Sequence, residues 1–266
     1  MPIVNQGAVS SPIVRGVLLD LGGIIYVGNT VIEGALAAVQ RLRKAELPLR
    51  FLTNTTRRSR KQVIADLSRM GLSVSDNELL TPALMARAFL ESHALSPFLV
   101  VHPNLEEDFA GLASGRPDAV VIGDAGEHFT YDRLNGAYRK ISAGAELLAL
   151  ARNRTFRDED GELSLDAGAF VAALEFASKR KAILFGKPSL EFFSLAVDSL
   201  GCDRVDVAMI GDDVEDDVGG AMCAGMKGIL VRTGKYRTGD ELELDFTPHC
   251  VADSLNGAVE WILHQR

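Results

Sequence analysis

Cysteine is scarce in this sequence of 266 residues, which contains only Cys202, Cys223 and Cys250. Their number is odd and their spacings match no metal-binding motif. Such sparing use of cysteine is typical of a reducing compartment, and we expect a cytoplasmic protein. Long apolar runs are scarce too: residues 1–12 do not have the pattern of a signal peptide, and no stretch is long enough to span a bilayer.

Positive charge is in short supply, because 28 lysine and arginine residues stand against 36 aspartate and glutamate residues, giving a formal net charge of -8. A nucleic-acid-binding protein needs a basic surface, so this balance argues against such a partner. The densest basic run, Arg57 to Lys61, is most simply the solvated start of a helix. An acidic protein can still bind a phosphate anion, because the groups nearest the anion decide its affinity.

Short apolar runs alternate with amphipathic stretches at both ends of the chain. Strands are predicted at 16–20 and 49–53, and helices at 33–45 and 59–70. This order predicts parallel strands with right-handed crossovers. The same rhythm returns after residue 182, with further strands at 183–185, 207–210 and 228–231, and helices after Ser189, through Val218 to Gly225, and at 255–264.

Residues 81–185 have a pattern of their own. They contain predicted strands at 98–101, 119–122 and 147–150, and predicted helices at 83–92, 131–143 and 169–179. That is about one domain's worth of chain. We therefore predict a doubly wound parallel α/β core in two pieces, residues 1–80 and 186–266, with an α/β cap domain inserted at 81–185, which we call the cap.

Polar residues stand where the predicted core strands end. Asp20 ends the first strand, Thr53 and Asn54 end the second, Lys187 follows the strand after the cap, and Asp212 ends the next. Open parallel sheets bind ligands at the carboxyl ends of their strands, so we expect these groups to meet. Carboxylates, an amine, a hydroxyl and an amide are the groups needed to move a phosphoryl group.

Each group has a place in such chemistry. The Asp20 carboxylate can attack phosphorus and form an aspartyl phosphate. Mg²⁺ prefers oxygen ligands, and Asp20 and Asp212 can supply them. Lys187 suits the phosphate oxygens, and Thr53 and Asn54 offer them further hydrogen-bond donors. Catalysis would then rest on positioning and electrostatics.

These residues also carry a family resemblance. Four segments, in this order, resemble the four motifs of the haloacid-dehalogenase (HAD) superfamily: Asp20-Leu-Gly-Gly, Thr53-Asn54, Gly186-Lys187-Pro188, and Gly211-Asp212-Asp213 with Asp216-Asp217. A large insertion between the second and third motifs resembles the NagD-like branch, subfamily IIA. Within that branch, the chain is similar to the phospholysine phosphohistidine inorganic pyrophosphate phosphatases and to domain-containing relatives of unassigned substrate.

The resemblance implies a role for each position. The nucleophile is Asp20, and the implied metal ligands are Asp20, the Gly22 carbonyl, Asp212 and Asp217. Asp217, or less directly Asp213 or Asp216, would hold metal-bound water or Lys187. The implied binding residues for a small phosphorylated substrate are Asp20, Gly22, Thr53, Asn54 and Lys187. A homodimer formed through the cap is implied as well.

One position departs from the family pattern. The family has an aspartate two residues after the nucleophile, which protonates the leaving group, whereas this chain has Gly22. General acid–base catalysis contributes about 10²- to 10⁴-fold, and its loss hurts poor leaving groups such as alkoxides most. We therefore expect a phosphatase for phosphoramidates, pyrophosphate or other activated esters. The alternative is a catalytically weak phosphate-binding or regulatory protein that keeps the site.

Overall fold

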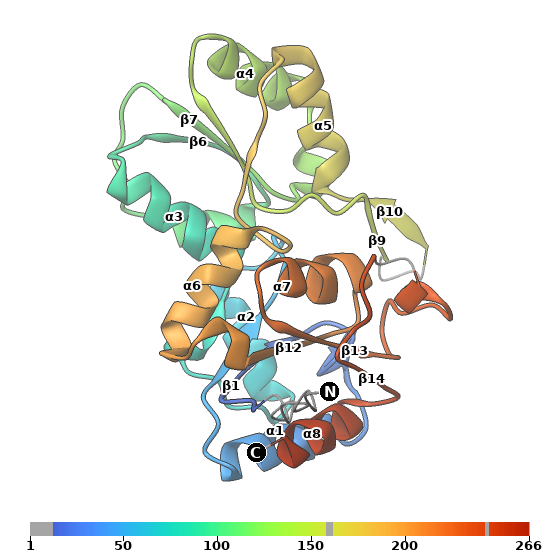
Figure 1. Ribbon diagram of the computed structural model, residues 1–266. Coiled ribbons are helices and arrows are strands. Elements are labelled where there is room, and N and C mark those ends of the chain that lie inside the picture. Colours follow the sequence, from blue (N-terminus) through green and yellow to red (C-terminus); the bar gives the residue numbers. More distant parts are fainter. Residues whose placement is uncertain (1–12, 158–161, 243–244, 266) are drawn as a thin grey trace, which may run out of the picture.

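The computed structural model describes residues 13–157, 162–242 and 245–265 (Figure 1). Residues 1–12, in which no signal peptide is predicted, lie outside these ranges. The polar stretches Asp124 to His128 and Asn153 to Asp160 are predicted to be loops of the cap, and the end of the second lies outside the described ranges as well. Within the described ranges, no helix is both long and apolar enough to cross a membrane.

A six-stranded parallel sheet forms the core. Its strand order is β14-β13-β12-β1-β4-β5, so that β1 lies between β4 and β12. All five residues of β1 are buried, as expected of a strand covered on both faces. The strands are β1 (Gly16–Asp20), β4 (Leu49–Leu52), β5 (Leu79–Leu80), β12 (Val207–Gly211), β13 (Lys227–Val231) and β14 (Cys250–Ala252).

Helices cover both faces of this sheet because successive side chains of each strand point to opposite sides. Val17 and Leu19 pack in a cluster with α1 (Ala35–Lys44), α2 (Arg60–Arg69) and α8 (Leu255–His264). Leu18 points the other way and packs with α6 (Leu190–Leu200) and α7 (Gly220–Cys223). The core is therefore the doubly wound parallel sheet that the sequence predicts.

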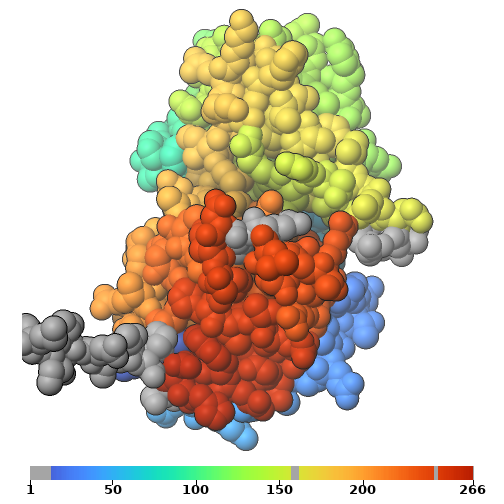
Figure 2. Space-filling view, turned by 45° about the vertical axis from the view of Figure 1, so that its right-hand side comes forward, coloured from blue at the N-terminus to red at the C-terminus, as the bar shows by residue number. Residues whose placement is uncertain are grey.

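A second parallel sheet lies in the cap, with strand order β11-β8-β7-β6. One face packs with α3 (Pro82–Ser92) and η2 (Pro103–Phe109), and the other with α4 (Tyr131–Ser142) and α5 (Ala167–Ser178). Its strands are β6 (Pro97–Val100), β7 (Ala119–Ile122), β8 (Glu146–Ala149) and β11 (Ile183–Leu184). In Figure 2, the green-to-yellow cap is stacked on the orange-to-red part of the core.

Several short elements were not predicted. These are β5, β14, and two antiparallel hairpins, β2–β3 (Tyr26–Val27 with Thr30–Val31) and β9–β10 (Thr155–Arg157 with Leu163–Leu165). Two or three residues are too few to show a periodic pattern. The predicted helix through Val218 is also different, because π-helical turns at Val214–Gly219 precede the short α7.

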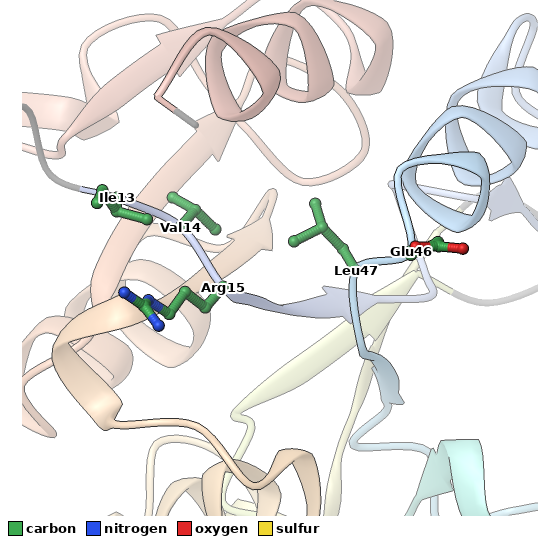
Figure 3. A pocket seen from close by; sticks show the side chains of 5 residues that line it. All are labelled: Ile13, Val14, Arg15, Glu46 and Leu47. Atoms are coloured by element: carbon green, nitrogen blue, oxygen red, sulfur yellow. The ribbon is translucent and has the colours of Figure 1, made fainter.

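A surface hollow lies away from the carboxyl ends of the strands. It is lined by Ile13, Val14, Arg15, Glu46 and Leu47, beside the start of β1 (Figure 3). Asp20 is at the other end of that strand. This hollow is therefore separate from the predicted site.

Candidate active site

The carboxyl ends of β1 and β12, and the segment that follows β11, bring four charged side chains together. The prediction of a core strand at 183–185 is wrong, because β11 pairs with β8 and belongs to the cap sheet, so Lys187 lies where the chain passes from the cap to the core. Lys187 Nζ lies 2.5 Å from Asp20 Oδ1 and 2.5 Å from Asp217 Oδ1. Asp20, Asp212 and Asp217 each offer an oxygen within 4.8 Å of those of the other two. All four side chains are buried, and the Lys187 side chain is only 4% exposed. Side chains from residues up to 197 positions apart in the sequence thus form one cluster.

The charges of this cluster do not balance, because three buried carboxylates surround one ammonium group. Burial, followed by the charge of Asp20, raises the pKa of Asp212 to about 7. Burial also raises the pKa of Asp217 well above its usual value, although Lys187 acts against it. Burial lowers the pKa of Lys187, but Asp20 and Asp217 outweigh it and raise that pKa, so Lys187 stays charged. The cluster carries an excess of negative charge only when more than one of the three carboxylates is ionised.

A divalent cation fits this donor set. Mg²⁺ binds oxygen ligands at about 2.1 Å, so ligands on opposite sides of the ion are about 4.2 Å apart. The oxygens of Asp20, Asp212 and Asp217 lie within 4.8 Å of one another, which is near this span, so small side-chain movements would let them share one ion. The ion would also offset the excess negative charge of the cluster.

The contacts of Asp217 distinguish between its two predicted roles. Its Oδ1 accepts from Lys187 Nζ, and its Oδ2 accepts from the backbone N–H of Asp213 at 3.2 Å. A Cβ at Gly211 would overlap the Asp217 side chain, so glycine is needed where that side chain crosses the end of β12. This arrangement favours the holding of Lys187 over the holding of metal-bound water.

Asn54 also serves Lys187. Its Oδ1 accepts from the Lys187 N–H at 2.9 Å, and its Nδ2 donates to the Lys187 carbonyl at 3.0 Å. A Cβ at Gly186 would lie 2.7 Å from Asn54 Oδ1, so the glycine makes room for this pairing. The Asn54 carboxamide thereby fixes the Lys187 backbone. The backbone N–H of Asn54 is then the donor left for the predicted phosphate contact. Thr53 Oγ1 accepts from Thr55 N at 3.1 Å, and its own O–H can still donate.

The departure at Gly22 leaves an open position. Gly22 is exposed, and a Cβ built on it would meet no atom within 4 Å. The next residue is different, since Gly23 has φ 77° and a Cβ there would overlap the Asp212 carboxylate. Glycine is therefore required at position 23, where it makes room for Asp212. At position 22 it is not required by packing, because nothing nearby would prevent a side chain.

The loop Thr233–Lys235 is a part of the site that was not predicted from the sequence. The Thr233 hydroxyl donates to the Gly23 carbonyl at 2.5 Å, and the Lys235 N–H donates to Asp212 Oδ2 at 2.6 Å. Lys235 Nζ also pairs with Asp213 Oδ2 at 3.0 Å. The loop thus holds both the turn after β1 and the Asp212 carboxylate. The sequence signal was the Thr-Gly-Lys that follows a buried strand.

We expect Gly234→Ala to damage this loop. Gly234 has φ 57°, and a Cβ there would overlap Asp212 Oδ2, so the carboxylate must move. A shift of about 1 Å in a catalytic group can lower the rate by about 10²-fold. Gly239→Ala is the matched control, because Gly239 also has a positive φ of 102° but no atom within 4 Å of its Cβ position. Gly239→Ala should lose roughly 1 kcal/mol of stability by urea unfolding, and Gly234→Ala should lose more, because its Cβ would also lie 2.5 Å from the Gly23 Cα. Equal turnover by the two would contradict the role assigned to the loop.

The cap meets the core beside this site. Arg57 Nε lies 2.5 Å from Asp124 Oδ2, and its guanidinium lies 4.4 Å from the centre of the Phe156 ring. The interpretation of the basic run as a solvated helix start is therefore wrong for Arg57, because an ion pair across the cap–core boundary holds it. The polar cap loops at 124–128 and 153–157 both reach the core, through Asp124 and Asn153.

Comparisons with known proteins agree with this geometry. A family model described as haloacid dehalogenase-like hydrolase matches residues 17–113, and a second, HAD-hydrolase-like, matches 184–258. The human haloacid dehalogenase-like hydrolase domain-containing protein 2 is 41% identical over 249 residues, which cover 94% of this chain and 96% of that protein. This chain belongs to the haloacid dehalogenase-like hydrolases.

Other haloacid dehalogenase-like hydrolases are also similar over nearly the full length. The phospholysine phosphohistidine inorganic pyrophosphate phosphatase of Danio rerio is 40% identical, over 95% of this chain and 96% of that protein. The p-nitrophenyl phosphatase of Archaeoglobus fulgidus has a TM-score of 0.87 at 26% identity, covering 94% of this chain and 100% of that one. NagD of E. coli has a TM-score of 0.82 at 23% identity, covering 92% of this chain and 98% of that one, and this shows the shared fold.

The predicted family and the fold class are therefore confirmed for this haloacid dehalogenase-like hydrolase. The roles predicted for individual residues stay predictions. The structure brings Asp20, Lys187, Asp212 and Asp217 into one cluster and places Asn54 against Lys187.

Proposed function

We propose that this hydrolase is a magnesium-dependent phosphatase that moves the phosphoryl group of a small substrate first to Asp20 and then to water. That the chain is a phosphohydrolase follows from its family and its phosphatase relatives. The finer assignment depends above all on one observation: Asp20 lies 2.5 Å from a buried ammonium group, beside two further carboxylates.

Two displacements at phosphorus complete the reaction. An Asp20 carboxylate oxygen attacks phosphorus, and the bond to the leaving group breaks with its electron pair on the leaving atom. Water then attacks the phosphorus of the aspartyl phosphate and releases inorganic phosphate and the free carboxylate. Lys187, held by Asp217 and Asn54, balances the negative charge that gathers on the phosphoryl oxygens. The Thr53 hydroxyl and the Asn54 N–H would bind those oxygens.

Magnesium would be held by Asp20, Asp212 and the Gly22 carbonyl, with Asp217 behind Lys187. When bound, the ion would neutralise the nucleophile and the phosphate together, so that two anions can approach each other. The acidic cluster supports this choice, because its oxygens are of the type that Mg²⁺ prefers and their charge is not balanced by Lys187 alone.

The open position at Gly22 points to a substrate with a good leaving group. No side chain there can protonate the departing atom, so the leaving group must depart as an anion or take its proton from water or another residue. Pyrophosphate and aryl phosphates meet this demand better than alkyl phosphates do, because their leaving groups are weak bases. A phosphoramidate meets it when its nitrogen already carries the proton, so that a neutral amine departs. Pyrophosphate agrees with the name of the inorganic pyrophosphate phosphatase relatives.

Phosphate release from a four-compound panel tests the proposal. The panel contains para-nitrophenyl phosphate, pyrophosphate, a phosphoramidate and glycerol phosphate, each assayed with Mg²⁺ and with a chelator. We expect turnover of the first three that is lost with the chelator, and slow turnover of glycerol phosphate. Turnover that survives the chelator, or that is equal for all four compounds, would contradict the proposal.

A second candidate is a phosphate-binding or regulatory protein with little turnover, which the missing acid at Gly22 favours. In that case no compound of the panel would release phosphate, although inorganic phosphate would bind in the presence of Mg²⁺. Isothermal titration of phosphate into the protein separates this outcome from a site that does not bind phosphate.

Three broader predictions belong with this function. We propose the domain limits 1–80, 81–185 and 186–266, supported by the separate sheets of core and cap. We also propose a homodimer through the cap, supported by exposed Phe176 and Tyr131 on its outer helices and testable by sedimentation equilibrium.

We also propose a cytoplasmic location, supported by the three cysteines, which are all free. Cell fractionation would test this location.

A further inference from the structure

Asn153 belongs to the cap, but its side chain reaches the core. Its Nδ2 donates to Asp216 Oδ2 at 2.6 Å, and its Oδ1 faces Asn54 Nδ2 at 3.5 Å. Asn54 lies in the first core piece and Asp216 in the second. One carboxamide therefore joins three stretches of chain that are distant in sequence.

The loop that carries Asn153 is fixed from behind. The Gly168 N–H, in the first turn of α5, donates to the Asn153 carbonyl at 3.0 Å, and the Asp166 N–H donates to the Arg154 carbonyl at 3.1 Å. A Cβ at Gly168 would overlap the carbonyl oxygen of Arg152, so the loop lies directly on the helix backbone. The loop that carries Asn153 is thus held in place by the start of α5 while the Asn153 side chain contacts the core.

Asn54 connects this contact to the nucleophile. Its carboxamide nitrogen carries two hydrogens, of which one points to the Lys187 carbonyl at 3.0 Å and the other to Asn153. Lys187 in turn places its ammonium group 2.5 Å from Asp20. A movement of the cap at Asn153 would therefore pass through one side chain to the backbone that carries the ammonium group.

We propose that Asn153 is a positioning residue, which seats the cap on the core and holds Asn54, and through it Lys187, in the geometry needed for phosphoryl transfer. The inference rests on the proposed function. Asparagine suits the place because it combines a donor for Asp216 with an acceptor for Asn54. A carboxylate at position 153 would keep the acceptor but would lack the donor.

A swap of partners tests the contact. Asn153→Asp sets two carboxylates against each other, so we expect kcat/KM for para-nitrophenyl phosphate to fall at least about tenfold, mostly in kcat. Adding Asp216→Asn restores a donor–acceptor pair with its direction reversed, and should recover most of the loss. Asn104→Asp, which adds the same charge at an exposed cap position, is the matched control and should change little. No recovery in the double variant would overturn the proposal.

A second measurement does not depend on activity. Asn153→Ala removes both contacts, so we expect faster amide hydrogen exchange in residues 150–157 and at Gly168 without substrate. Unchanged exchange, or unchanged kcat for this variant, would overturn the proposal. Failure of the proposed function itself would be seen separately, as the absence of phosphate release by the wild-type protein.

Discussion

Asp20→Asn is expected to lower kcat by at least about 10⁴-fold while the chain stays folded. A carboxamide cannot accept the phosphoryl group as a carboxylate does, so the first displacement is lost. The side chain keeps its shape, and Asp217 remains to pair with Lys187. Removing one of three crowded carboxylates also relieves repulsion, so we expect Tm to change by less than about 4 °C.

Two assays check this expectation. Steady-state phosphate release gives kcat, and acid quenching with phosphate-labelled substrate shows whether label stays covalently bound to the protein. Label should be trapped on the wild-type chain and absent from the variant. Asp198→Asn makes the same chemical change at an exposed acid on α6 and should leave both results unchanged. Retained turnover by Asp20→Asn would exclude Asp20 as the nucleophile.

Gly22→Asp should have the opposite effect on poor substrates. An acid two residues after the nucleophile could protonate an alkoxide leaving group, and such catalysis contributes about 10²-fold or more. The backbone accepts the change, because the φ of Gly22 is not positive and its Cβ position has no atom within 4 Å. We expect kcat/KM for glycerol phosphate to rise by about 10²-fold, with little change for para-nitrophenyl phosphate.

Gly22→Asn is the decisive control for that gain. It adds a side chain of the same size that cannot donate a proton from a carboxyl group. A rise with aspartate alone supports the missing acid as the limit on alkyl phosphates. Equal results for the aspartate and asparagine variants would show that something other than proton transfer sets the preference.

Much of the site could be predicted because its residues follow buried strands. Asp20 and Asp212 end apolar runs, so the carboxyl edge of the core sheet collects them. Lys187 joins them by a different route, because it follows β11 of the cap sheet where the chain returns to the core. The role of Asn54 could not be predicted, because the donor and acceptor of its carboxamide suit a phosphate as well as a backbone. Only the structure shows that both groups of the Asn54 carboxamide are hydrogen-bonded to the Lys187 backbone.

The contributions of the cap and of the loop after β13 could not be read from local pattern. Asn153 contacts Asp216 across 63 residues, and Lys235 contacts Asp212 across 23. Asn153 has no distinctive neighbour in sequence, and its contact depends on how the cap packs on the core. The Thr-Gly-Lys at Lys235 marks a turn after a buried strand, but it does not identify Asp212 as the partner. The short strands β5 and β14 were missed for a related reason, since tertiary pairing rather than local preference defines them.

The central place of β1 has a consequence for the newly made chain. Its pairing with β4 can form early, but its other neighbour, β12, ends at residue 211, which is 131 residues beyond the end of β5 at residue 80. At about 5 to 20 residues per second, a ribosome needs roughly 7 to 26 seconds to make that stretch. During this interval one edge of a largely apolar strand has no partner from its own chain, so β1 is the segment at which chaperone binding or aggregation during synthesis should begin.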